Sequence, residues 1–355
     1  MFSLRRKSQP FVGIDISSTS VKLIELSRSG NSIRVESYGV EPLPANAVVE
    51  KNISDTSAVT SSLNKALSRA GTKAKKCALA VPTSAAVTKI IHMPSDLNDE
   101  ELEAQIHLEA DQYIPSPLDE VNLDFEVLGT NEQNPDKIDV LLVVARTEIV
   151  ESRAAIAEAA GLQPIVMDVE SFATANAYRL IEPYIPHDAP SDSNVVAIID
   201  VGATMTSITV TENEQVIYSR EQPFGGRQLT EEIMRRYGLS YAEAGLAKKE
   251  GGLPDNYITE ILTPFKDTLA QQANRLMHFF FANSSHGTVN EIILAGGTAG
   301  IPGLDELIEK HTHIRTTIAN PFSQMSFNSK INQQRLGNDA PALMIAVGLA
   351  LRNFD

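Results

Sequence analysis

The sequence has few of the features that define secreted, disulfide-stabilised or membrane-spanning proteins. Cysteine occurs once in 355 residues, as Cys77, so no internal disulfide can form and the composition fits a reducing compartment. The stretch KKCALAVP around Cys77 is strand-like, which predicts a packed side chain. The longest apolar run, residues 342–351, is too short to cross a bilayer. Asp15 interrupts the apolar stretch after the basic start, so we predict no signal peptide and a cytoplasmic protein.

The charge balance argues against one broad class of partner. The chain carries 45 acidic and 30 basic residues, a formal net charge of −15, so we expect no nucleic acid partner bound across a wide basic surface. The one dense basic cluster is Arg5, Arg6 and Lys7. It fits a solvated terminus or a weak contact with anionic lipid headgroups. The length and a hydrophobic content of 43% indicate a globular protein of about two domains.

Strand-like and helical segments alternate along the chain, which places it in the α/β class. Residues 58–70 have helical spacing and precede Gly71, a typical helix stop. Residues 98–114 begin with Asn98 and Glu101 in the pattern of a capping box. One face of that helix is apolar, formed by Leu102, Ile106, Ala110 and Tyr113. We expect this stripe to be core, since one face of a surface helix must pack inward.

Two segments share an unusual order of residues. FVGIDISSTSVKLIEL, residues 11–26, and VVAIIDVGATMTSITV, residues 195–210, each run from an apolar strand through one Asp and small residues into a second strand. Superposed, Asp15 meets Asp200, Ser17 meets Gly202 and Thr19 meets Thr204. Each segment alone also fits a plain β-hairpin with Asp as a turn former. The repeat suggests two similar half-domains facing each other.

Turns of this kind can hold phosphate. Their successive backbone N–H groups are exposed, and small side chains allow an anion to approach. The candidate residues are Ser17, Ser18, Thr19, Gly202, Ala203, Thr204 and Thr206. Asp15 and Asp200 are candidates to hold a hydrated Mg²⁺ between carboxylate and phosphate. Lys22 fits either a phosphate contact or a solvated strand position.

A third motif follows in EIILAGGTAGIPGLDELI, residues 291–308. An apolar strand runs into Gly296, Gly297 and Thr298 before a helix begins. The motif fits a strand-to-helix connection without a ligand, or a flat backbone surface for a nucleoside. Together, two Asp turns and one GG turn in this order are fairly specific.

These three motifs resemble those of the actin, Hsp70 and sugar-kinase superfamily. There the Asp turns are the two phosphate loops and the GG turn is the adenosine loop, which implies two similar domains around an ATP and Mg²⁺ site. DVESFATANAY and ALMIAVGLAL stand where that superfamily has its two connecting helices. Lys248 matches a Lys that contacts the ribose in the superfamily. Gly245 stands where the accompanying Glu is expected, so only the displaced Glu243 could substitute.

Within the superfamily, the chain is most similar to the PilM family of type IV pilus assembly proteins, relatives of the cell-division protein FtsA. The resemblance includes EAQIHLEADQYIPSPLDEVNLDFEVLG and VVARTEIVESRAAIAEAAGLQP. It implies an ATP-binding cytoplasmic adaptor, peripheral to the inner membrane, that serves pilus biogenesis and twitching motility. The implied partners are the N-terminal cytoplasmic tail of PilN, other inner-membrane and motor components of the pilus, and further copies of the chain. Membrane association would come mainly through these partners.

The proline-containing break at residues 182–193 is the predicted domain boundary. The resemblance adds an extra subdomain of the FtsA (SHS2) type, which borders the groove for the PilN tail. The predicted units are a basic segment 1–10, a first actin-like domain 11–182 with the extra subdomain at about 81–161, and a second domain 194–355 with a helical subdomain at about 231–285.

Two other functions stay open at this point. An FtsA-like membrane-associated polymer would end in a basic amphipathic helix, which the ending LALRNFD does not provide. A small-molecule kinase needs a catalytic base, and the cleft-side sequence offers none that is evident. Asp168 and Glu170 are weak candidates for positioning a water, with capping of the following helix as the alternative role. We therefore expect at most a slow ATPase.

Overall fold

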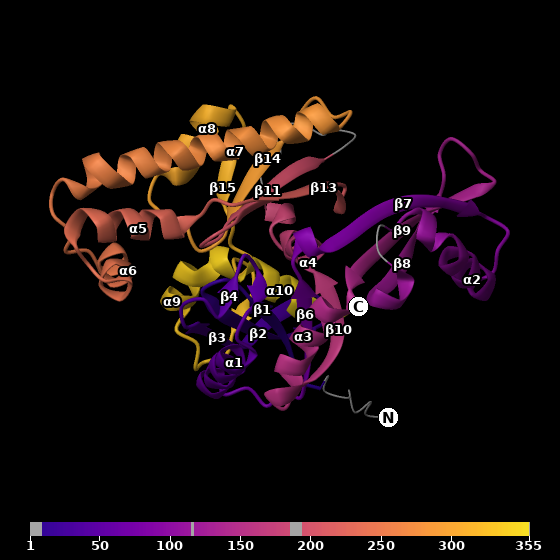
Figure 1. The fold of residues 1–355 in the computed structure, drawn as a ribbon, viewed down its shortest axis with the longest axis horizontal. Helices are drawn as coiled ribbons and strands as arrows, with labels where there is room; N and C mark the ends of the chain where they lie inside the picture. Colours follow the sequence, from indigo (N-terminus) through magenta and orange to yellow (C-terminus); the bar gives the residue numbers. More distant parts are fainter. Residues whose placement is uncertain (1–8, 115–116, 185–193, 355) are drawn as a thin grey trace.

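The computed structural model describes residues 9–114, 117–184 and 194–354. Two helix-covered sheets form two lobes, and a smaller sheet projects from the side of the first (Figure 1). This is the predicted α/β architecture. The basic cluster Arg5 to Lys7 and most of the predicted boundary, residues 185–193, lie outside the described residues.

The first sheet has the strand order β10-β6-β1-β2-β3-β16. Its strands are β1 (Phe11–Ile16), β2 (Ser20–Ser29), β3 (Ser32–Pro42), β6 (Lys76–Val81), β10 (Gln163–Val169) and β16 (Ser326–Phe327). β1 is central: it is antiparallel to β2 and parallel to β6. A two-stranded hairpin, β4 (Val48–Val49) and β5 (Asn52–Ile53), leads from this sheet into α1 (Thr56–Ala70). Gly71 ends α1 in the left-handed conformation, as predicted.

The second sheet has the strand order β13-β12-β11-β14-β15. Its strands are β11 (Val195–Val201), β12 (Thr206–Glu212), β13 (Gln215–Gln222), β14 (Glu291–Ala295) and β15 (Thr316–Ile318). The Asp-bearing strand β11 is antiparallel to β12 and parallel to β14, which repeats the arrangement around β1. The internal repeat in the sequence therefore corresponds to a repeat in topology.

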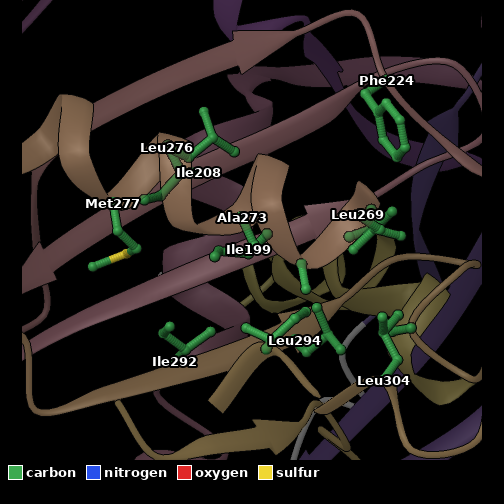
Figure 2. Packing of buried hydrophobic residues seen from close by; sticks show 14 of the residues in the cluster. Ile199, Ile208, Phe224, Leu269, Ala273, Leu276, Met277, Ile292, Leu294 and Leu304 are labelled. Atoms are coloured by element: carbon green, nitrogen blue, oxygen red, sulfur yellow. The ribbon is translucent and has the colours of Figure 1, made fainter. Parts of the chain in front are cut away.

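Helices cover the second sheet and complete its core. They are α5 (Gly226–Tyr237), α6 (Tyr241–Glu250), α7 (Thr263–Asn283) and α8 (Leu304–Thr312). The apolar face of α7, which includes Leu269, Ala273 and Leu276, lies against Ile199 and Ile208 of the sheet (Figure 2). Burial of this continuous apolar face is the main force that holds the lobe together.

The extra unit of the first lobe consists of a three-stranded sheet of order β7-β9-β8 and the helices beside it. Its elements are β7 (Ala86–Pro94), α2 (Asp99–Glu109), β8 (Val121–Thr130) and β9 (Lys137–Arg146). The next helix, α3 (Thr147–Ala159), packs against the first sheet instead, because its buried Ile156 and Ala157 belong to the core of that sheet. Asn98 and Glu101 form the predicted capping box at the start of α2. Leu102, Ile106 and Ala110 are buried against the sheet, so the apolar stripe of α2 is core, as expected.

Two helices cross between the lobes, α4 (Glu170–Tyr178) and α10 (Met344–Leu351) (Figure 1). They approach each other so closely that a Cβ on Gly348 would lie 1.7 Å from the carbonyl oxygen of Ala173. The range expected to form the second domain also returns to the first sheet, because β16 pairs with β3 and α10 packs against β1. The short helix α9 (Gln333–Asp339) precedes this return. In the described part of the chain, no helix combines the length and apolarity needed to cross a membrane.

Candidate functional site

The first Asp turn is built around a buried ion pair. Asp15 and Lys22 stand opposite each other on β1 and β2, and Lys22 Nζ donates to Asp15 Oδ2 at 2.7 Å. Ser17 Oγ donates to the same oxygen at 2.9 Å. The turn is closed by a backbone bond from Ser17 N to Ser20 O. Lys22 is thus a cation fixed beside the turn and not a solvated strand residue.

The second turn repeats this geometry with one substitution. Gly202 N donates to Met205 O at 2.9 Å, the equivalent of the Ser17 bond. Ser207 stands opposite Asp200, in the place that Lys22 has opposite Asp15. Asp200 therefore lacks a cation directly across the strand pair. Burial raises the pKa of Asp200, Lys22 and Lys51 lower it, and the negative charges of Asp15 and Glu221 raise it further.

The GG turn is held directly against the second Asp turn. Gly296 has φ +91°, and a Cβ at this position would lie 2.4 Å from Val201 O and 2.6 Å from Asp200 Oδ1, so only glycine fits. Thr298 Oγ1 donates to Gly202 O at 3.1 Å. Gly297 is exposed, and an added Cβ there would meet only Ala342, at 4.0 Å. The backbone at Gly297 is therefore open, as a nucleoside surface at the GG turn would require.

The two Asp turns also contact each other across the lobes. Thr204 Oγ1 donates to Ser18 Oγ at 2.8 Å, although the residues are 186 positions apart. Thr206, in contrast, is buried, and its hydroxyl donates to Phe224 O. Its hydroxyl thus holds β12 to the turn before α5 and is not free for a ligand.

Lys248 reaches the same region from α6. Its Nζ donates to Thr230 Oγ1 at 2.9 Å and to Gly226 O at 3.4 Å. A Cβ on Gly226 would meet Thr298 Oγ1 at 2.4 Å, so Lys248 stands next to the GG turn. Glu243 has a helix-capping role instead. Its carboxylate accepts from Ser240 N and Ser240 Oγ at the start of α6.

The donor set fits a hydrated divalent cation better than a directly bound one. The described residues contain no group of three or more His, Cys, Asp or Glu side chains arranged to hold a metal ion. Asp15 and Asp200 lie near enough for the charge of Asp15 to act on Asp200. Mg²⁺ usually keeps several water ligands and uses one or two carboxylates, which these two residues could supply through water.

Sequence reasoning missed a charged cluster beside the Asp turns. Lys51, in the turn of the β4–β5 hairpin, donates to Glu170 at the start of α4 and to Glu221 Oε1 on β13 at 2.6 Å. All three side chains are largely buried. Desolvation alone would lower the pKa of Lys51, but the two carboxylates raise it above its usual value. Burial raises the pKa of Glu170 to about 7, although Lys51 lowers it.

The two weak catalytic candidates have different surroundings. Asp168 Oδ2 accepts from Arg352 Nε at 2.7 Å, and its Oδ1 accepts from Val169 N. Asp168 thereby ties β10 to the end of α10. Glu170 instead belongs to the Lys51 cluster, and the charge of Asp15 contributes to its raised pKa. Of the two, only Glu170 stands beside the Asp turns.

A separate groove of about 930 Å³ runs between α1 and α3. The α1 wall carries Thr60, Ser61 and Asn64, and the α3 wall carries Ser152 and Ala155. The walls carry mostly small and polar side chains, together with the basic residues Lys65 and Arg69. α3 lies within residues 81–161, the range expected for the extra subdomain, but its buried Ile156 and Ala157 belong to the core of the first sheet.

Comparisons with known proteins find similarity over most of the chain. The structure of a PilM-PilN type IV pilus biogenesis complex is 26% identical, covers 97% of this chain and 98% of that chain, and has a TM-score of 0.78. Cell division protein FtsA of Bacillus subtilis (strain 168) is 24% identical over 363 residues, 88% of this chain and 78% of FtsA. Ethanolamine utilization protein EutJ from Carboxydothermus hydrogenoformans shares the fold, with a TM-score of 0.57 and 15% identity over 98% of this chain and 91% of EutJ.

These similarities confirm the predicted two-lobed actin-like fold and the resemblance to PilM and FtsA. The family model for type IV pilus assembly protein PilM matches residues 13–354, which include both Asp turns, the GG turn and both crossing helices. The chain therefore belongs to the PilM family of type IV pilus assembly proteins.

Proposed function

We propose that this protein is an ATP-binding adaptor of the type IV pilus platform that binds the N-terminal cytoplasmic tail of PilN. The observation that carries the proposal is the similarity, over nearly the full length of both chains, to a PilM solved as a complex with PilN. The protein would act at the cytoplasmic face of the inner membrane and reach the membrane mainly through such partners. Other inner-membrane and motor components of the pilus are further partners in this proposal.

The nucleotide part of the proposal is supported by the assembly of the three turns. The Thr204–Ser18 bond joins the two Asp turns, and the Thr298–Gly202 bond joins the GG turn to the second of them. Phosphates would lie on the backbone N–H groups of the Asp turns, near Lys22. The nucleoside would lie against Gly297. Mg²⁺ would neutralise phosphate charge while held through water by Asp15 and Asp200, and Lys248 would stand on the ribose side.

Rapid hydrolysis is not part of this function. Glu170 is the acidic side chain best placed to orient a water, but it is buried and paired with Lys51. The arrangement supports a nucleotide that stabilises a conformation, with at most slow turnover.

The groove between α1 and α3 is the proposed peptide site. Its α3 wall follows β9, the last strand of the extra unit, directly in the chain, and its hydroxyl-bearing walls leave room for an extended chain. Hydroxyl and amide groups along the walls can pair with the backbone of a peptide. An FtsA-like polymer would instead use the outer surface of the lobes for contacts between copies.

Isothermal titration of the full chain with the PilN-tail peptide tests the proposal. We expect saturable one-to-one binding, lost in Ala155→Trp, which fills the groove, and kept in Ala159→Ser, which lies on the same wall and barely changes its volume. A scrambled peptide is the control for charge. Absence of binding to the wild type, with and without Mg-ATP, would contradict the adaptor function, and concentration-dependent filaments would then favour the polymer.

A further inference from the structure

The hairpin residue Lys51 connects the nucleotide cleft to the peptide groove. Its ammonium group bridges Glu170 of the crossing helix and Glu221 of the second lobe. Its backbone carbonyl accepts from Arg153 Nη2 at 2.9 Å, and Arg153 lies on α3, one wall of the groove. The side chain of Lys51 is thus bound beside the nucleotide cleft, and its backbone carbonyl is bound by a helix of the groove.

The other wall of the groove is joined to Lys51 through the chain itself. The hairpin strand β5 begins at the next residue, and α1 starts five residues after Lys51. Ser54 N and Asp55 N both donate to Ala47 O, which fixes the base of the hairpin. A movement that separates α1 from α3 must therefore displace Lys51 or break its bond to Arg153.

The backbone at this point is held in a costly conformation. Glu50 and Lys51 have φ +48° and +64°, the left-handed region that non-glycine residues seldom occupy. Such a two-residue turn normally carries Asn or Gly. Strained positions persist where the surroundings fix them, and they are common at sites that switch or bind. Here the surroundings are Arg153 on one side and two carboxylates on the other.

Arg153 has little other reason to be buried. Its side chain is 3% exposed, and none of the described carboxylates lies within ion-pair distance of its guanidinium. Burial lowers the pKa of Arg153, while the charges of Glu170 and Asp15 raise it. A buried guanidinium without a paired carboxylate is expensive. Arg153 Nη1 donates weakly to Ile149 O of its own helix at 3.5 Å, so the bond to Lys51 O at 2.9 Å is the stronger one and ties the guanidinium to the hairpin.

We infer that Arg153 and Lys51 form a relay that couples peptide binding in the α1–α3 groove to nucleotide binding in the cleft. The inference rests on the proposed function and adds its regulation. The two-state element is the bridge from Lys51 to Glu170 and Glu221, which is made when the lobes are close and broken when they separate. A peptide that moves α3 shifts Arg153, which moves the hairpin and favours one state of the bridge. By linkage, nucleotide binding changes peptide affinity by the same factor.

The test measures that factor in matched variants. The Kd of the PilN-tail peptide is determined by calorimetry with and without a non-hydrolysable ATP analogue and Mg²⁺. We expect the two Kd values of the wild type to differ by about five-fold or more. In Arg153→Met, the peptide Kd values with and without nucleotide should differ by less than about two-fold, while each ligand alone still binds. Glu221→Gln should act in the same direction from the opposite end of the relay, and it covers the case in which Arg153→Met does not fold.

Lys73→Met is the matched control, because Lys73 is an exposed lysine of the same lobe. It should keep the wild-type ratio. A wild-type ratio of one, or an unchanged ratio in folded Arg153→Met and Glu221→Gln, would overturn the relay while leaving the adaptor function intact. Failure of the wild type to bind the peptide at all would instead reject the proposed function and the relay with it.

Discussion

Thr204 and Ser18 join the two halves of the candidate nucleotide site by one hydrogen bond between their hydroxyl groups, 2.8 Å long. Each residue belongs to one Asp turn, and the turns come from different lobes. The contact shows that the two copies of the internal repeat face each other, so a ligand that touches one turn also lies near the other. Because the two Asp turns lie together, they form one candidate site.

The energy of this contact can be measured by a double-mutant cycle. Ser18→Ala and Thr204→Val each remove one partner, and the hydrogen bond should contribute about 0.5–1.5 kcal/mol to the free energy of unfolding. Urea unfolding of the wild type, both single variants and the double variant gives the coupling energy. Fully additive effects would show that the bond between the hydroxyls adds nothing to lobe closure.

Asp200→Asn should separate metal binding from folding. The raised pKa of Asp200 shows that its charged form is disfavoured by burial, so the neutral amide should not lower the thermal midpoint. The affinity for Mg-ATP should fall roughly ten-fold or more, the loss of about one charge-assisted contact. Calorimetry with and without Mg²⁺ checks this. Equal loss in both conditions would remove the metal role from Asp200.

The two glycines of the GG turn should respond differently to substitution. Gly296→Ala should destabilise the fold, because it combines φ +91° with contacts at 2.4 and 2.6 Å. Gly297→Val should leave the thermal midpoint nearly unchanged and weaken ATP binding, since its added atoms enter open space at the proposed nucleoside surface. Thermal unfolding and nucleotide titration together distinguish these outcomes. Normal ATP affinity in Gly297→Val would place the nucleoside elsewhere.

The raised pKa of Glu170 predicts that the stability of the chain depends on pH. Its pKa is raised from 4.5 to about 7 by burial, so the folded chain binds this proton more tightly than the unfolded chain. The resulting stabilisation is complete below about pH 4.5 and is lost as pH rises through about 7. In Glu170→Gln this loss should disappear, so the free energy of unfolding should decline less between pH 5 and 7.5. Parallel pH profiles of wild type and variant would contradict the raised pKa.

Close packing of the crossing helices predicts a sharp difference between two glycines near the C-terminus. Gly348→Ala places a Cβ 1.7 Å from Ala173 O, which forces α4 and α10 apart and should cost about 1–3 kcal/mol or more. Gly337→Ala on α9 meets no atom within 4 Å and should stabilise the chain by about 0.5–1 kcal/mol. Chemical denaturation measures both. A tolerated Gly348→Ala would mean that the two helices can separate without cost.

Much of the fold could be predicted from local pattern. The capping box at Asn98 and the stop at Gly71 need only a few neighbouring residues, and both are present as predicted. The repeated Asp motif predicted two equivalent strand arrangements, because apolar strands, turns and their order are encoded over short distances. Lys22 was left open between two roles, and its pairing with Asp15 is a register contact that the sequence does not specify.

The residues that only the folded chain brings together have no local signal. Lys51 lies in a Glu-Lys hairpin turn, 119 residues from Glu170 and 170 from Glu221, and nothing in the neighbouring sequence predicts either partner. By itself the sequence determined the Asp and GG turns and the family, since these depend on short motifs and their order. The tertiary structure decided the Thr204–Ser18 contact, the Lys51 bridge and the groove between α1 and α3. These depend on how the lobes and helices pack, which long-range burial and ion pairing settle.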